Sequence, residues 1–151
     1  MSNDELKSVL SARFPEAGIL LGSQYIEMTV NVDSLHETAV KLKEMNDFSF
    51  DYLFCLTGVD YSESMAVIYH LESIRHRHVM VLKVRTADRI NPAIDTVSDV
   101  WRTAKYHERE VYDLLGIHFN NHNDLRRLFL EDGWGFPLRK DYVDEVRIVE
   151  R

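Results

Sequence analysis

The first 45 residues carry the pattern of a helix, a strand and a second helix. A Ser2-x-x-Glu5 pair, the spacing of a capping box, precedes apolar residues at helical spacing from Leu6 to Leu10. Residues 25–32 then alternate strictly between apolar and polar side chains, which predicts a half-buried strand. A second capping-box spacing, Ser34-x-x-Glu37, opens a helix whose apolar stripe consists of Leu35, Ala39, Leu42 and Met45.

The middle of the chain is strand-like. Residues 48–57 are bulky and mostly apolar on both faces, which predicts a central strand. Residues 65–72 and 78–86 are rich in Val, Ile, Tyr and Leu and are joined by a short linker. These two segments therefore predict an antiparallel hairpin.

The pattern becomes helical again after Pro92. Val97, Val100 and Trp101 fall within one helical turn, and a further helix runs from about Thr103 to Leu115. Gly116 follows at a position suited to a helix C-cap, and beyond it the periodicity fades.

This order of elements predicts two parts. We expect an α+β domain over residues 1–116 and an extended, irregular C-terminal tail over residues 117–151 that wraps a partner. The domain should contain a mainly antiparallel sheet with helices packed on one side. The tail is rich in aromatic and Arg side chains and has no evident core of its own, so it must pack on something, as interface segments do.

Composition narrows the classes of function. The chain has 151 residues, a net charge of −7 and a single cysteine, Cys55. One thiol cannot form an internal disulfide or hold an ordinary Fe–S cluster, which needs about four thiolates. No apolar run approaches the roughly 18–20 residues that span a bilayer, and the acidic N-terminus is unlike a secretory or transit signal. A soluble protein in a reducing compartment is expected.

Two rival functions can be formulated from these residues. A small metal-dependent enzyme would use His107, Glu110, His118 and His122, although their spacing lacks the His-Glu-x-x-His pattern of zinc hydrolases. A nucleic-acid-binding module would use the basic residues of the 75–89 hairpin region, where Lys83 and Arg85 share one strand face. The negative net charge and the lack of an aromatic platform argue against this second function. A solvated, charge-protected sheet face explains the same residues.

The densest group of charged and aromatic residues lies between positions 108 and 142. Arg109 and Asp113 stand four apart and can pair on the helix surface. The many Arg and carboxylate side chains that follow suit a hydrogen-bonded network, because the planar guanidinium binds carboxylates through two parallel bonds. Ordinary surface charge is the other interpretation. The candidate partner-contact residues, some of which could instead tie the tail to its own domain, are Glu108, Arg109, Tyr112, Asp113, His122, Arg126, Arg127, Trp134, Arg139, Lys140, Asp141 and Tyr142.

Three motifs in this region resemble, in order, the 30 kDa-type subunit family of respiratory complex I, the NADH:quinone oxidoreductase. They are Glu-Arg-Glu-Val-Tyr-Asp-Leu-Leu-Gly-Ile at 108–117, His-x-Asp-Leu-Arg-Arg at 122–127 and Pro-Leu-Arg-Lys-Asp-Tyr at 137–142. Upstream, residues 56–61 and 67–71 look like the central strands of the family. The resemblance covers about residues 48–147.

The resemblance implies a role that composition and spacing do not show. It implies a non-catalytic scaffold subunit in the peripheral arm of a proton-translocating NADH:quinone oxidoreductase, docked on the large quinone-site subunit. It implies no catalytic residue, metal or cofactor in this chain, with Fe–S clusters and FMN in partner subunits. It places the chain on the cytoplasmic side of the membrane, attached only through partners. Equivalent subunits of a membrane-bound hydrogenase or of ferredoxin- or F420-linked complexes are the alternative.

Overall fold

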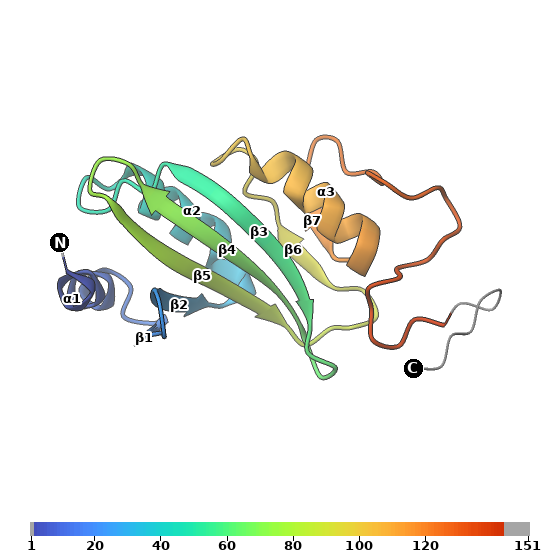
Figure 1. Cartoon of the computed structure of the whole chain (residues 1–151), viewed down its shortest axis with the longest axis horizontal. Helices are drawn as coiled ribbons and strands as arrows, with labels where there is room; N and C mark the ends of the chain where they lie inside the picture. Colours follow the sequence, from blue (N-terminus) through green and yellow to red (C-terminus); the bar gives the residue numbers. More distant parts are fainter. Residues whose placement is uncertain (1, 144–151) are drawn as a thin grey trace.

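The computed structural model describes residues 2–143 and consists of a five-stranded sheet, a two-stranded sheet and three α-helices (Figure 1). The helices are α1 (Asn3–Arg13), α2 (Leu35–Glu44) and α3 (Ala104–Leu115), with a 3-10 turn η1 (Val32–Ser34) before α2. The strands of the large sheet are β1 (Gly18–Leu21), β2 (Ile26–Val30), β3 (Tyr52–Asp60), β4 (Met65–Ser73) and β5 (His78–Thr86). The small sheet contains β6 (Ala93–Asp95) and β7 (His118–Asn120).

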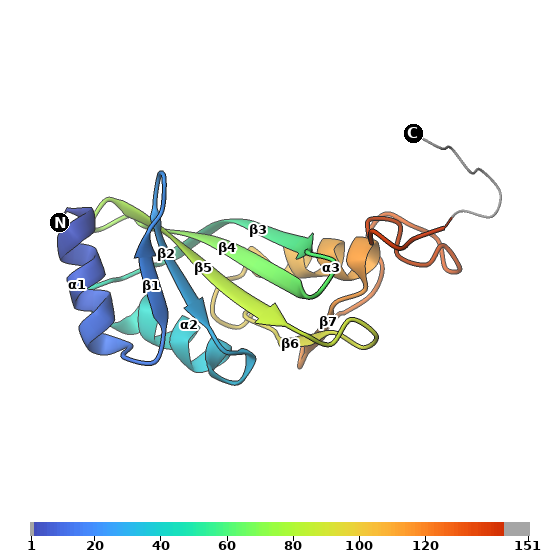
Figure 2. The ribbon, with the colours of Figure 1, turned by 90° about the horizontal axis from the view of Figure 1, so that it is seen from below.

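The large sheet has the strand order β1-β2-β5-β4-β3. All neighbours are antiparallel except β2 and β5, and the predicted hairpin of β4 and β5 is confirmed, with Ser73 opposite His78 nearest the turn. Helices α1 and α2 cover one face (Figure 2). On that face, Met28, Leu82, Tyr69 and Leu56 form one row across four strands and are all buried. The expected α+β fold, with helices on one side of a mainly antiparallel sheet, is confirmed.

The two predicted capping boxes differ in outcome. At the start of α1, the Glu5 N–H donates to the Ser2 hydroxyl at 3.2 Å and the Ser2 N–H donates to the Glu5 carboxylate at 2.8 Å, so the first box is confirmed. Before α2, the Ser34 side chain makes no capping bond and its hydroxyl bonds to the Asn31 carbonyl instead. The second prediction was wrong because Ser34 is the last residue of η1 and its hydroxyl bonds back to that turn, away from the first N–H groups of α2.

The predicted central strand over residues 48–57 was also wrong in position. The strand runs from Tyr52 to Asp60 and lies at the edge of the sheet, whereas Phe48 and Phe50 are buried in the preceding turn. The segment is apolar on both faces for two separate reasons. Its first part belongs to the core, and its second part exposes Tyr52 and Phe54 on the sheet face opposite the helices.

Helix α3 packs on β3 at a point where only glycine fits. A Cβ atom at Gly58 would lie 2.6 Å from Leu115 and 2.7 Å from Val111, so glycine permits this close approach. The predicted turn before the helix is confirmed, since the Trp101 N–H bonds to the Val97 carbonyl at 2.9 Å. The predicted helix and its C-cap are confirmed too, with Gly116 in the left-handed conformation at φ 73°.

The small sheet was not predicted. Strand β7 lies parallel to β6, with Phe119 opposite Ile94, and both side chains are buried. The packed part of the chain therefore continues to Asn120, four residues past the expected boundary at Gly116. Of the predicted tail, residues 144–151 lie outside the described part of the structure. Within residues 2–143, none of the helices combines the length and hydropathy that crossing a bilayer requires.

Candidate functional site

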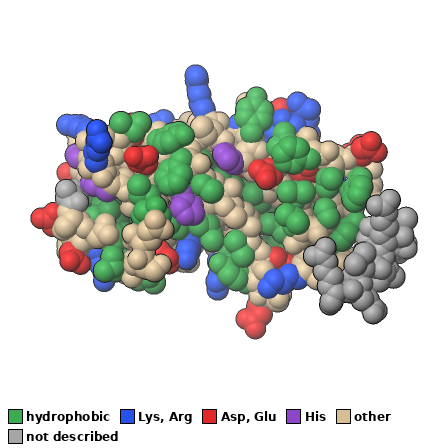
Figure 3. Space-filling model, viewed as in Figure 1, with side chains coloured by type: hydrophobic (Ala, Val, Ile, Leu, Met, Phe, Trp, Pro, Cys, Tyr) green, Lys and Arg blue, Asp and Glu red, His purple; other side chains and the backbone are tan. Residues whose placement is uncertain are grey.

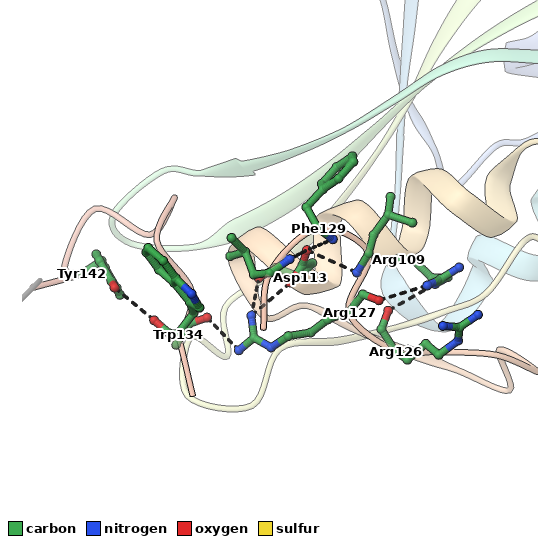
Figure 4. Close-up of polar contacts among 10 residues, drawn as sticks. Arg109, Asp113, Arg126, Arg127, Phe129, Trp134 and Tyr142 are labelled. Atoms are coloured by element: carbon green, nitrogen blue, oxygen red, sulfur yellow. Dashed lines mark hydrogen bonds and ion pairs between the residues drawn. The ribbon is translucent and has the colours of Figure 1, made fainter. Parts of the chain in front are cut away.

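One face of α3 binds the main chain of the segment that follows β7, which we call the tail (residues 121–143). Figure 4 shows Arg109 and Asp113 of α3 directed at Arg126, Arg127 and Phe129 of the tail. Both helix residues are buried, and no ion pair joins them within the described structure. The expected surface pairing of Arg109 with Asp113 was therefore wrong, because each side chain is used by the tail.

Asp113 is the centre of this contact. Its Oδ2 atom accepts the backbone N–H groups of Leu128, Phe129 and Leu130 at 3.2, 2.7 and 3.1 Å. Its Oδ1 atom accepts a bond from Arg127 Nη1 at 3.0 Å. Burial by itself would raise the pKa of Asp113, but the three N–H groups and the guanidinium outweigh it and hold the pKa below its ordinary value.

Two arginines add further hydrogen bonds between α3 and the tail, one donating from the helix and the other from the tail. Arg109 donates from α3 to the main-chain carbonyls of Arg126 and Arg127 at 3.2 and 3.0 Å. Arg127 donates from the tail to the Asp113 carbonyl at 3.1 Å and to the Gly135 carbonyl at 2.8 Å. Because most of these partners are main-chain atoms, the contact fixes the path of the tail main chain.

The end of α3 holds the second half of the tail. Arg139 Nε donates to the Leu115 carbonyl at 2.6 Å, and the Leu138 N–H donates to the Leu114 carbonyl at 3.0 Å. The guanidinium groups of Arg127 and Arg139 lie 5.2 and 5.0 Å from the centre of the Phe136 ring. The bonds from Arg139 and Leu138 satisfy the Leu115 and Leu114 carbonyls, which lie in the last turn of α3 and lack partners within the helix.

The tail also reaches the end of β3. The Lys140 N–H donates to Asp60 Oδ2 at 2.9 Å, and Arg89 pairs with the same carboxylate through both of its terminal nitrogens. The hydrogen bond from Arg89, helped by the Lys140 and Ser62 N–H groups, holds the pKa of Asp60 far below its ordinary value against the opposing effect of burial. Asp60, Arg89 and Phe136 were not among the predicted site residues. Asp60 belongs to the segment 56–61 that resembles a central strand of the family, and Arg89 belongs to the basic hairpin region 75–89.

The start of the tail is held near the N-terminal end of α3. The side chain of His122 is buried, with the Lys105 carbonyl 3.0 Å from Nε2 and the Asp124 N–H 3.0 Å from Nδ1. The Glu108 carboxyl approaches Nε2 at 3.8 Å and is bonded by the Thr96 hydroxyl at 2.5 Å and the Val97 N–H at 2.8 Å. Glu108 therefore lies in the interior of the domain and does not contact solvent.

Other tail side chains point outward. Arg126, Lys140 and Asp141 are exposed, and Tyr142 is half-buried, with its hydroxyl bonded to the Trp134 carbonyl at 3.0 Å. Tyr112 of α3 is also half-buried. The large apolar side chains exposed along the tail are Phe129 (67%), Trp134 (48%), Leu138 (60%) and Val143 (69%). In Figure 3, hydrophobic side chains gather over the right half of the face, where α3 and the tail lie in the matching view of Figure 1.

The twelve predicted residues therefore divide into three groups. Glu108, Arg109, Asp113, His122, Arg127 and Arg139 connect the tail to its own domain. Arg126, Trp134, Lys140 and Asp141 present their side chains to solvent, with Tyr112 and Tyr142 in between.

The residues of the rival sites are dispersed or paired. Within residues 2–143, no three His, Cys, Asp or Glu side chains gather as a metal ion would require. His107 and Glu110 line a groove between β3 and α3, whereas His118 is exposed on β7. In the basic hairpin, Lys83 pairs with Glu27 at 2.8 Å, and Arg85 lies 4.3 Å from the centre of the Tyr61 ring.

Similarity to known proteins agrees with this architecture. The sequence model of the family described as "Respiratory-chain NADH dehydrogenase, 30 Kd subunit" matches residues 28–146. The C/D-type subunit of the NADH-quinone oxidoreductase of Phocaeicola vulgatus is 46% identical over 119 residues, which are 78% of this chain and 22% of that protein. The C-type subunit of the same enzyme from Chloroherpeton thalassium is 42% identical over 77% of this chain and 50% of its own length. The chain thus spans half or less of these two relatives.

Longer matches exist as well. The C-type subunit of the NADH-quinone oxidoreductase of Vesicomyosocius okutanii is 32% identical over 95% of this chain and 85% of its own length. A chain in the structure of the membrane-bound sulfane sulfur reductase, an archaeal respiratory membrane complex, superposes with a TM-score of 0.80 at 23% identity. That match covers 95% of this chain and 86% of the other, and at this identity it shows the shared fold alone. By the family match and the identity to these relatives, the chain belongs to the family of the 30 kDa subunit of respiratory-chain NADH dehydrogenase.

Proposed function

We propose that the chain is a non-catalytic connecting subunit of a proton-translocating NADH:quinone oxidoreductase. In this role it forms part of the peripheral arm and docks on the large quinone-site subunit through its tail. The Fe–S clusters and FMN belong to other subunits, and the chain lies on the cytoplasmic side of the membrane, held there by its partners. The names of the relatives, which are subunits of NADH-quinone oxidoreductases, support this proposal.

One observation carries the docking proposal. The tail is fixed to α3 through bonds such as those from the Phe129 and Leu138 N–H groups, while Phe129, Trp134, Leu138 and Val143 project large apolar surfaces into solvent. Large apolar side chains exposed along one short segment are typical of a protein-binding surface. A rigidly held backbone also lowers the entropy lost on binding, because the segment is already ordered.

The charges of the tail suit the same role. Arg126 and Asp141 are exposed beside the apolar side chains and supply polar contacts at the rim of an interface. Tyr106 of α3 extends the surface, being exposed beside Arg109. The tail and the outer side of α3 then form one continuous docking face.

An equivalent subunit of another respiratory complex is the second candidate. The fold shared with a chain of the archaeal sulfane sulfur reductase complex favours it. The two candidates differ in the electron donor of the complex, which is a property of other subunits.

The experiment is affinity purification of the tagged chain from its native host in mild detergent, with identification of the co-purified subunits. Leu138→Asp introduces a charge on the docking face, and Leu20→Asp makes the same change on β1, where Leu20 is also exposed. If Leu138 is a central contact worth at least about 2 kcal/mol, recovery of the partners should fall about thirtyfold with Leu138→Asp. The Leu20 variant should behave like the wild type. Equal recovery with both variants, or loss with Leu20→Asp alone, would contradict docking through the tail.

A deletion provides a second test. Cutting after Gly116, the domain boundary expected from the sequence, would remove the buried side chains of Ile117 and Phe119 and damage the domain. Cutting after Asn121 retains β7 and removes residues 122–151, which include all of the tail except Asn121. We expect the shorter chain to fold, as judged by circular dichroism, and to recover no partner subunits.

A further inference from the structure

Two buried titratable side chains meet where the tail leaves the domain. Glu108 of α3 and His122 of the tail are both inaccessible to solvent, and Glu108 Oε2 lies 3.8 Å from His122 Nε2. Neither residue is used by the docking face. They connect α3, the turn after β6 and the first residues of the tail, so their charges bear on how the tail is held.

The hydrogen bonds of His122 define its protonation. The Lys105 carbonyl only accepts, so Nε2 must carry a proton to bond with it. The Asp124 N–H only donates, so Nδ1 must be unprotonated to receive it. His122 is therefore the neutral Nε2–H tautomer, and its ring closes a turn from residue 122 to residue 124.

The surroundings of Glu108 leave its carboxyl without a cation. The titratable groups around it are Tyr69 from β4, Asp99 from the turn before α3 and His122 from the tail, and Asp95 of β6 lies beside Tyr69. Among the described residues, His122 is the only basic side chain within 4 Å of the carboxyl. Burial raises the pKa of Glu108 to about 7, although bonds from Thr96 and the Val97 N–H act in the opposite direction.

We propose that Glu108 and His122 form a proton-operated latch, which closes the start of the tail while the pair carries one titratable proton. A proton on His122 Nδ1 would face the Asp124 N–H as donor against donor, in place of the 3.0 Å hydrogen bond. The turn at residues 122–124 must open. Loss of the proton from Glu108 leaves a buried carboxylate beside a neutral ring, and displacement of His122 at the start of the tail would let water reach this charge.

The latch thus responds to acid and to base through different residues. The effect of the latch on assembly rests on the proposed function, because opening of the turn can affect a complex only if the tail docks on a partner subunit. The latch itself is a property of the isolated chain. Failure of the latch therefore leaves the proposed function untouched, and failure of assembly leaves the latch untouched.

Nuclear magnetic resonance of the full 151-residue chain, labelled with ¹⁵N, tests the proposal. The ring nitrogens of His122, assigned by their absence in His122→Asn, report the tautomer directly. The exchange rate of the Asp124 amide proton, corrected for the intrinsic effect of pH, reports the opening of the turn. With one proton involved on each side, opening should increase by up to tenfold per pH unit away from the closed range.

The pH dependence of the opening has two limbs, an acid limb in which opening increases as the pH falls and an alkaline limb in which it increases as the pH rises. Two variants separate them. Glu108→Gln keeps a neutral side chain and should abolish the alkaline limb alone. His122→Asn keeps an acceptor for the Asp124 N–H, since an Asn side chain bonds the amide two residues ahead, and should abolish the acid limb alone. Glu110→Gln, half-buried on the same helix, and His118→Asn, exposed on β7, are the matched controls and should change neither limb.

The decisive outcomes are distinct. A neutral His122 carrying its proton on Nε2, together with selective loss of one limb in each variant, supports the latch. A proton on Nδ1 in the wild-type chain overturns it even if a variant fails to fold. Survival of both limbs in Glu108→Gln and His122→Asn also overturns it.

Discussion

Replacing Asp113 by Asn should release the tail from α3 while the domain stays folded. Asn has the shape of Asp but only one oxygen, whereas Asp113 uses one oxygen for three backbone N–H groups and the other for Arg127. In either orientation, the new amide N–H₂ faces a donor. Loss of one charge-assisted bond costs about 1.5–3 kcal/mol, and breaking a buried ion pair costs about 3–5 kcal/mol. Since Arg127 keeps some access to solvent, about 3 kcal/mol is expected for the tail contact.

Hydrogen–deuterium exchange measured by mass spectrometry can quantify this loss. A change of about 3 kcal/mol corresponds to roughly a hundredfold decrease in protection, which should be confined to peptides containing Leu128, Phe129 and Leu130. Asp132→Asn removes the same charge from an exposed side chain of the tail and is the control. Unchanged protection at residues 128–130 would refute the role of Asp113 in holding the tail. A uniform loss of protection across the domain would show that Asp113 stabilises the whole fold instead.

Three further changes test the packing and the charge of the site. Phe119→Ala empties a buried position on β7 and should lower the free energy of unfolding by about 3–5 kcal/mol in urea titrations; a change below about 1 kcal/mol would mean that β7 is not part of the core. Gly116→Ala would place a Cβ atom 2.6 Å from the Phe136 ring, whereas the Cβ atom of Gly133→Ala would have nothing within 4 Å. Both glycines have a positive φ, so Gly116→Ala should lower the free energy of unfolding by about 1–3 kcal/mol more than Gly133→Ala does. Equal effects of the two substitutions would exclude the clash. The pKa of Glu108 is raised in the folded chain from 4.5 to about 7, so its contribution to stability is complete below pH 4.5 and disappears as the pH rises through 7, by up to about 3 kcal/mol. Glu108→Gln should remove this slope in urea titrations between pH 4.5 and 8, and an unchanged slope would assign it to other groups.

Local patterns predicted those parts of the fold in which near neighbours decide the structure. The Ser2 and Glu5 cap, the hairpin of β4 and β5, and the helix ending at Gly116 depend on spacings of a few residues. The same reasoning placed the strand after Phe50 in the centre of the sheet, because an apolar run does not distinguish a buried strand from a buried turn followed by an edge strand. It missed β6 and β7 because three-residue strands carry too few positions for a period.

The candidate site was likewise predicted only in part: the sequence indicated its residues but not their partners. Residue types and the family motifs singled out Arg109, Asp113 and Arg127 as chemically important, but the spacing paired the first two with each other. Their actual partners are mostly backbone N–H and carbonyl groups of distant residues, such as the Phe129 N–H and the Arg126 carbonyl. Every residue has such groups, so no side-chain pattern marks which of them will be bound.

The order of residues was enough to show that this chain forms an α+β domain with a charged tail and resembles a family of respiratory subunits. The folded chain was needed to show that half of the predicted contact residues connect the chain's own tail to its domain and that Glu108 is buried beside His122. The physical reason is that burial and charge pairing depend on which segments fold against one another. A carboxylate has the same chemistry at every position in a sequence, and its surroundings in the folded chain make it an anchor, as at Asp113, or a titrating group, as at Glu108.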